Sequence, residues 1–293
     1  MFAPQIVSDM IKRLVILSAI ALAVISCSNA SQPLQMSDFC YEGGKPEAAV
    51  SIQAQLPVGA SRVESVIRAC LLENLYISVD PDVFGAGEAS FPPYGGNPSD
   101  CAAAVEYIGS SALGSLADLS SADDAGGYAI TYECDADLQL VRETEDYAVF
   151  NVSAYFYTGG AHGSMLGAGP LTFSKKNGEE FSAFLVDSAL ESLQGALLKG
   201  LRSYFEECGD TFGSDSEVLA QLFINDGIIP LPGYSLSPEE DGLRFLYQQY
   251  EVACYAAGMP TFVIPYSVLE PYLTPAARRL LAKDIQSSSK DNQ

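Results

Sequence analysis

Basic residues, histidine and long apolar runs are all scarce in this sequence of 293 residues. Lys and Arg number 15 against 37 Asp and Glu, which gives a formal net charge of −22. This balance argues strongly against a nucleic-acid partner, because phosphates are bound by clustered Lys and Arg. Acidic surfaces keep exported proteins soluble, and they also favour encounter with a basic protein. Beyond the N-terminal segment, no apolar run is long enough to predict a transmembrane helix.

The chain has one histidine, His162, and it has no Cys-x-x-Cys pair. The missing cysteine pair argues against a zinc ribbon or a thioredoxin-type site. The acidic runs, such as residues 143–146, do not have the spacing of a calcium-binding loop. We therefore expect no metal and no cofactor.

The N-terminus has the pattern of an export signal. Lys12 and Arg13 precede the apolar run 14–25, which is too short to span a membrane comfortably. The run ends at Cys27 in a sequence that resembles the bacterial lipobox, in which the signal is cut before a cysteine that is then lipidated. We expect residues 1–26 to be a lipoprotein signal peptide that starts at Met1 or Met10. Cys27 then carries the lipid anchor of an envelope protein facing the periplasm or the exterior.

The remaining cysteines are even in number, which is typical of a protein in an oxidising compartment. They predict up to three disulfides, but the sequence alone cannot choose among the possible pairings. The candidates are Cys40, Cys70, Cys101, Cys134, Cys208 and Cys254.

Hydrophobic periodicity predicts alternating strands and helices. Apolar residues spaced for one helical face follow Ser61, a suitable N-cap, and a second helix is expected at 100–119. Strands are expected at 49–58, 128–134, 138–143, 147–158, 168–174, 243–250 and 261–265. Asn177-Gly178 predicts a hairpin turn leading to a strand at 181–185. Further helices are expected at 217–223, from Thr274-Pro275, and from a capping box at 188–191. The buried stripe of the helix that begins at 188–191 is expected to be Leu190, Leu193, Leu197, Leu201, Tyr204 and Phe205.

These elements indicate an α+β fold, in which an antiparallel sheet has helices packed on one face and two coupled halves meet near residue 145. We expect a tether at 27–46, an N-terminal half at 47–145 and a C-terminal half at 146–286. The polar residues 287–293 predict a disordered tail.

The segment from Tyr155 to Gly163 reads Y-F-Y-T-G-G-A-H-G. It resembles the signature of an extracellular domain found in the anti-sigma factor RsiV and the peptidoglycan deacetylase PdaC. Residues 250–258 and 263–267 are similar to two further motifs of that domain, and 47–145 resembles the companion domain that usually precedes it. Cys254 stands where the family has proline, and with Cys208 at a helix end it suggests an added disulfide.

The resemblance implies binding more than catalysis. The RsiV domain binds lysozyme as a receptor, whereas PdaC deacetylates through a separate domain with an Asp-His-His metal site. A chain with one histidine cannot supply that site, so we expect a binding protein more than an enzyme. The expected ligand is a basic protein such as lysozyme, or peptidoglycan, and contact with the membrane is through the lipid anchor only.

The candidate ligand-binding residues lie in these motifs. Tyrosines stack on sugar rings and anchor protein interfaces, although they also cap sheet edges and cores. The candidates are Tyr155, Tyr157, Thr158, Gly159, Gly160, His162 and Tyr255. Two alternatives stay open: an envelope hydrolase with His162 as general base, and a structural lipoprotein without a small ligand.

Overall fold

The computed structural model describes residues 32–81, 90–122, 130–159, 163–224, 226–233 and 236–291, in an α+β fold with two sheets. The chain divides into two compact units. Unit 1 comprises the chain as far as Leu140 together with 151–168, and unit 2 comprises 141–150 together with the chain from Gly169. The boundary expected near 145 thus falls inside the short segment 141–150, after which the chain returns to unit 1.

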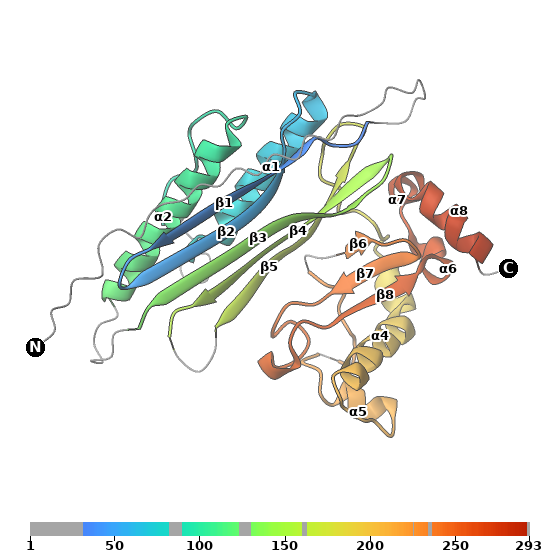
Figure 1. The fold of residues 1–293 in the computed structure, drawn as a ribbon. Coiled ribbons are helices and arrows are strands. Elements are labelled where there is room, and N and C mark those ends of the chain that lie inside the picture. Colours follow the sequence, from blue (N-terminus) through green and yellow to red (C-terminus); the bar gives the residue numbers. More distant parts are fainter. Residues whose placement is uncertain are drawn as a thin grey trace, which may run out of the picture. The chain divides into compact units, whose positions relative to one another are not determined.

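The first sheet has the strand order β1-β2-β3-β4-β5 and the second has the order β6-β7-β8 (Figure 1). The strands of the first sheet are β1 (Met36–Gly44), β2 (Ala48–Pro57), β3 (Tyr132–Glu143), β4 (Tyr147–Tyr157) and β5 (Ser164–Ser174). Those of the second are β6 (Leu236–Pro238), β7 (Gly242–Leu246) and β8 (Thr261–Pro265). The helices are α1 (Arg62–Ser78), α2 (Cys101–Ala122), α3 (Ala189–Ser192), α4 (Gln194–Glu207), α5 (Asp215–Leu219), α6 (Tyr266–Leu269), α7 (Pro275–Leu280) and α8 (Ala282–Asp291).

The sheets are mostly antiparallel, as expected, but the first sheet contains a parallel pair that the sequence did not predict. Strands β1 and β2 form an antiparallel pair, but β2 and β3 are parallel, with Ala48 opposite Tyr132 and Ala54 opposite Leu138. A parallel pair needs a long crossover connection, because the chain must return to the same end of the sheet. The segment that contains α1 and α2 makes that connection (Figure 1).

Helix α1 begins as the sequence predicts. The Ser61 hydroxyl accepts from the Glu64 backbone N–H at 3.1 Å, and the Glu64 carboxylate accepts from the Ser61 backbone N–H at 3.4 Å. This reciprocal pair is a capping box, which satisfies two donors that the first turn leaves without helical partners. Ile67, Leu71 and Leu75 are buried on one face, as the 3.6-residue period requires.

Helix α2 has a glycine where it approaches strand β1. A Cβ at Gly109 would overlap the ring of Tyr41, a buried residue of β1, whereas a Cβ at Gly114 would meet no described atom within 4 Å. Gly109 therefore allows close packing of α2 on the sheet, at the cost in helix propensity that glycine brings.

Unit 2 packs α4 on the second sheet. Leu193, Leu197, Leu201 and Phe205 form one buried stripe, as the sequence predicts. A Cβ at Gly200 would overlap the ring of Phe262 in β8, so this glycine sets the approach of α4 to the sheet.

The expected tether at 27–46 is too long. Residues 36–44 form β1, in which Phe39 and Tyr41 are buried and paired with β2. The alternation of buried Phe39 and Tyr41 with more exposed neighbours is the pattern of a strand, and it outweighs the glycines that suggested a linker. Residues 27–31 lie outside the described residues.

Four predicted elements differ from the structure. The strands expected at 128–134 and 138–143 are replaced by one strand, β3, which runs without a break from 132 to 143. The segment 181–185 forms no strand but ends in an isolated bridge between Leu185 and Leu273. Ser188 has helical backbone angles and makes no side-chain cap, so the expected capping box is not formed. The predicted helix is divided into α3 and α4, with a break at Leu193.

The expected disordered tail is a helix as far as Asp291. The Ser288 hydroxyl donates to the Asp284 carbonyl at 2.9 Å and to the Glu240 carbonyl at 3.2 Å. Ile285 packs against the core of unit 2, which stabilises helix α8 in spite of its polar composition. Among the described residues, no helix has both the length and the apolar character needed to cross a membrane.

Candidate functional site

The signature segment in unit 1 is partly described. Tyr155 and Tyr157 lie at the end of β4 and are half-buried, Thr158 is exposed, and Gly159 has φ of +91°. This angle explains the glycine, because side chains beyond hydrogen strain that backbone region. Gly160 and His162 lie outside the described residues.

The two ends of the signature pack on each other. A Cβ at Gly163 would overlap the hydroxyl end of the Tyr155 ring, so the ring lies across this glycine. Tyr155 and Gly163 therefore have a packing role that joins the end of β4 to the start of β5. Tyr155 is one of the candidates, whereas Gly163, the last residue of the signature, is not.

A second group of aromatic residues lies in unit 2, on the segment Tyr247–Gly258, here called the aromatic loop. The rings of Tyr250 and Tyr255 lie 5.9 Å apart between centroids, with an interplanar angle of 42°. Tyr250 is 58% exposed and has φ of +65°. A bulky residue at positive φ is a backbone outlier, and such outliers concentrate at functional sites.

Polar contacts hold the aromatic loop in place. The Glu251 carboxylate accepts from the backbone N–H groups of Gln248 at 2.7 Å and Gly233 at 2.6 Å. The Tyr204 hydroxyl donates to the Ala257 carbonyl at 2.9 Å. These bonds fix both sides of the Tyr250–Tyr255 pair, so the exposed ring of Tyr250 is presented on an ordered backbone.

A further exposed aromatic residue adjoins this loop. The backbone N–H of Phe223 donates to the Val252 carbonyl at 2.7 Å, and the side chain of Phe223 is 56% exposed. Large aromatic side chains that stay exposed on neighbouring segments are typical of an interface that a partner covers. The aromatic loop and Phe223 therefore form the candidate binding surface.

Sequence reasoning included Tyr255 but omitted Tyr250 and Phe223 from the ligand-binding candidates. A spacing pattern reports which residues alternate between core and water, and it does not report a left-handed backbone at a tyrosine. The candidates Tyr155, Tyr157, Thr158 and Gly159 belong to unit 1, whereas Tyr255 belongs to unit 2.

A partly buried network of three polar side chains in unit 2 could suggest a catalytic site, but its bonds indicate a structural role. The Asp284 carboxylate accepts from the Tyr147 hydroxyl at 2.6 Å and from Arg142 at 3.0 Å, and Arg142 also donates to the Tyr147 hydroxyl at 2.9 Å. Burial, and then the bond to Asp284, raise the pKa of Tyr147 above its usual range. Every member of this network has a partner within it, so its role is to join β3, β4 and α8.

The described residues contain no group of three or more His, Cys, Asp or Glu side chains placed to hold a metal ion. Cys101 and Cys134 are buried free thiols, and Cys208 and Cys254 are exposed free thiols. The full set of three disulfides is therefore absent from this structure. Pairing of Cys208 with Cys254 stays a prediction.

Cys134 has a measurable consequence for stability at alkaline pH. Burial, and then the nearby Asp135, raise the pKa of its thiol from 9.0 to about 12. Between these values the unfolded chain releases a proton that the folded chain keeps, so this contribution to stability is present below pH 9.0 and is lost as the pH rises towards 12.

We expect the free energy of unfolding of wild type to fall, relative to that of Cys134→Ala, by about 1.4 kcal/mol per pH unit above pH 9. Urea unfolding of both proteins at several pH values measures the difference, since the tyrosines common to both cancel. If the free energies of unfolding of the two proteins changed with pH in parallel, the Cys134 thiol would have the same pKa in the folded and unfolded chains, which would contradict this prediction.

The aromatic loop lies inside a segment that matches a known protein family. Residues 215–267 match a family model described as "Protein of unknown function (DUF3298)". The matched segment runs from α5 to the start of α6 and contains Tyr250 and Tyr255. None of the curated proteins matches the chain.

Two solved structures share the fold. One is a member of the DUF3298 family from Bacteroides fragilis NCTC 9343, with 17% identity, a TM-score of 0.60, and coverage of 88% of this chain and 100% of that chain. The other is a DUF3298 family protein from Pseudomonas aeruginosa PAO1, with 14% identity, a TM-score of 0.54, and coverage of 84% of this chain and 97% of that chain. At these identities the likeness shows the fold alone.

Proposed function

We propose that this chain is a lipid-anchored binding module of the cell envelope whose ligand is a basic protein such as lysozyme. The observation that carries the proposal is the exposed ring of Tyr250, held at φ of +65° against Tyr255 by an ordered loop. A strained and exposed aromatic residue has no role in the core of unit 2. It is the kind of side chain that anchors protein interfaces.

Charge supports a basic partner over an acidic one. The chain has a net charge of −22, which attracts a cationic protein over a distance of about one Debye length. The resemblance to the lysozyme-binding domain of RsiV agrees with that sign. Peptidoglycan is the other ligand to test, because tyrosine rings also stack on sugars. Anchoring at Cys27 would hold the module at a membrane, where either ligand is met.

The variant Tyr250→Ala tests the proposal. It removes the exposed ring and leaves the polar contacts of Glu251 intact, and we expect its Kd for lysozyme to rise about tenfold, or ~1.4 kcal/mol. Isothermal titration of the whole chain in detergent measures the affinity. Ile77→Ala, which shortens an exposed side chain of α1 in unit 1, is the matched control and should bind like wild type. Equal affinity of Tyr250→Ala and wild type would contradict the role of the aromatic loop.

A further inference from the structure

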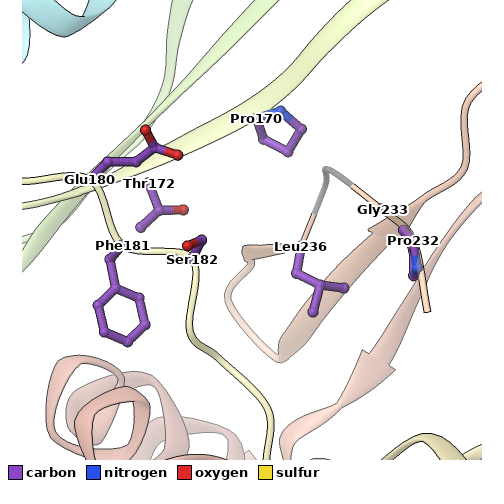
Figure 2. Close-up of a pocket in the computed structure, with 8 residues that line it drawn as sticks. All are labelled: Pro170, Thr172, Glu180, Phe181, Ser182, Pro232, Gly233 and Leu236. Carbon is purple, nitrogen blue, oxygen red and sulfur yellow. The ribbon is translucent and has the colours of Figure 1, made fainter. Parts of the chain in front are cut away.

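Unit 2 contains a cavity of about 110 Å³ that the proposed function does not use (Figure 2). Its lining comes from the end of β5, from the segment 180–182 that follows the turn, and from the segment around Pro232 and Leu236. Since one water molecule occupies about 30 Å³ of the liquid, the cavity has room for a small group and not for a whole sugar chain.

Thr172 is the unusual residue of this cavity. Its side chain is 2% exposed, and among the described residues its hydroxyl oxygen Oγ1 has no hydrogen-bond partner. The Thr172 carbonyl accepts from the Phe181 N–H at 2.7 Å, which fixes the residue in the strand. Its hydroxyl points to the side on which Leu236 lies (Figure 2). A buried hydroxyl without a partner is unfavourable, so a ligand atom that bonds to it would be stabilised.

The charge and the hydrogen-bond acceptors of the cavity indicate which kind of ligand would fit. Glu180 is the one charged side chain among the described residues that line it, so an anion would be repelled. The Glu180 carboxylate, the Thr172 hydroxyl and the Ser182 hydroxyl can each accept a hydrogen bond. A primary ammonium group is compact, carries one positive charge and donates three hydrogen bonds, so it matches these acceptors in number and in charge.

The remaining walls are apolar. Pro170, Pro232 and Leu236 line the cavity beside the polar residues. Such walls suit methylene groups, as when a lysine side chain buries its stem and bonds through its head group.

We propose that this cavity binds a primary ammonium group on an aliphatic stem, which is the chemistry of a lysine side chain or of a free alkylamine. The cavity adjoins the aromatic loop through Gly233, which lines the cavity and donates its backbone N–H to Glu251. The ammonium site itself rests on Thr172 and Glu180 and does not depend on the proposed function. Failure of lysozyme binding would therefore leave it standing, and its own failure would leave the aromatic loop unaffected.

The test titrates the whole chain in detergent with Nα-acetyl-lysine-N-methylamide, followed by NMR or calorimetry. Nα-acetyl-norleucine-N-methylamide is the matched ligand, because it has the same four-carbon stem without the ammonium group. We expect saturable binding of the lysine compound with a Kd in the millimolar range, about 1 mM, and at least about tenfold weaker binding of the norleucine compound. Equal binding of the two compounds, or no saturable binding, would overturn the proposal.

Two variants locate the site. Glu180→Gln removes the charge at nearly constant shape, and Thr172→Val removes the buried hydroxyl at nearly constant volume. We expect each to weaken binding of the lysine compound about fivefold or more, and we expect Thr172→Val to unfold at a higher urea concentration than wild type, because its orphan hydroxyl is gone. Glu179→Gln makes the same charge change at a neighbour outside the lining and should leave binding unchanged. Wild-type affinity in both cavity variants would overturn the assignment.

A final arm separates the two sources of the ammonium group. Reductive dimethylation of lysozyme keeps each lysine charge but leaves one N–H donor. If a protein lysine occupies the cavity, the modified lysozyme binds less tightly and the lysine compound competes with unmodified lysozyme. If lysozyme binds and neither effect occurs while the lysine compound binds, the occupant is a free alkylamine.

Discussion

Replacing Asp284 by alanine is expected to lower the free energy of unfolding of unit 2 by about 1.5–3 kcal/mol. The side chain of Asp284 is 13% exposed and accepts from both Arg142 and Tyr147. Its removal leaves the Arg142 charge without its carboxylate and leaves the Tyr147 hydroxyl with one partner fewer. Hydrogen bonds to a charged group are stronger than neutral ones, and Arg142, which is half-buried, is only partly compensated by water when the carboxylate is gone. Urea unfolding followed by far-UV circular dichroism measures the loss.

The adjacent residue provides the control. Lys283 contacts Glu145 and Asp146, but its side chain is 59% exposed. Exposed ion pairs are screened by water and contribute about 0–1 kcal/mol, so Lys283→Ala should lose less than about 1 kcal/mol. If Asp284→Ala and Lys283→Ala lost similar amounts, the Arg142–Tyr147–Asp284 network would not stabilise unit 2 as described.

Gly200→Ala should destabilise unit 2 by about 1–3 kcal/mol. The added Cβ would overlap the ring of Phe262, which is stacked on Phe245 at a centroid distance of 5.7 Å, so the ring has little room to move. The same substitution at Gly195, in the first turn of the same helix, would meet no described atom within 4 Å. Because alanine favours a helix by up to about 1 kcal/mol over glycine, Gly195→Ala should be neutral or stabilising.

Thermal or urea unfolding of the two glycine variants beside wild type measures this contrast. The amino acid introduced and the helix are the same, so the difference reports the approach of α4 to β8 alone. Opposite signs are expected for the two changes in stability. A stabilising Gly200→Ala would mean that α4 and β8 are farther apart than the structure places them.

Local sequence patterns predicted the elements whose packing is local. Ser61 and the period of residues 63–71 identified α1, and the stripe from Leu193 to Phe205 identified α4. The parallel pairing of β2 with β3 could not be predicted, since strand direction depends on a crossover between distant segments. The tail was wrong for a similar reason: its composition is polar, but Ile285 and Asp284 make tertiary contacts that stabilise the helix.

Some features of the candidate sites could likewise be predicted from the sequence, and others could not. The tyrosine motifs pointed to the stretch that contains the aromatic loop, and Tyr255 was identified from them. The positive φ of Tyr250 and the orphan hydroxyl of Thr172 are consequences of the folded structure, because both depend on what surrounds the residue. From the sequence alone, Thr172 is an ordinary threonine in a predicted strand, where threonine is common.

The most direct test of the central claim is lysozyme binding by the whole chain in detergent at about 0.05 M and about 1 M salt, where the Debye length is about 3 Å. The proposed function predicts binding at both concentrations, with an affinity that weakens at high salt but persists, because the aromatic loop contributes contact that salt does not screen. Binding that disappears at high salt would mean charge attraction alone. Absence of binding at both concentrations would contradict the claim, and peptidoglycan would be tested next.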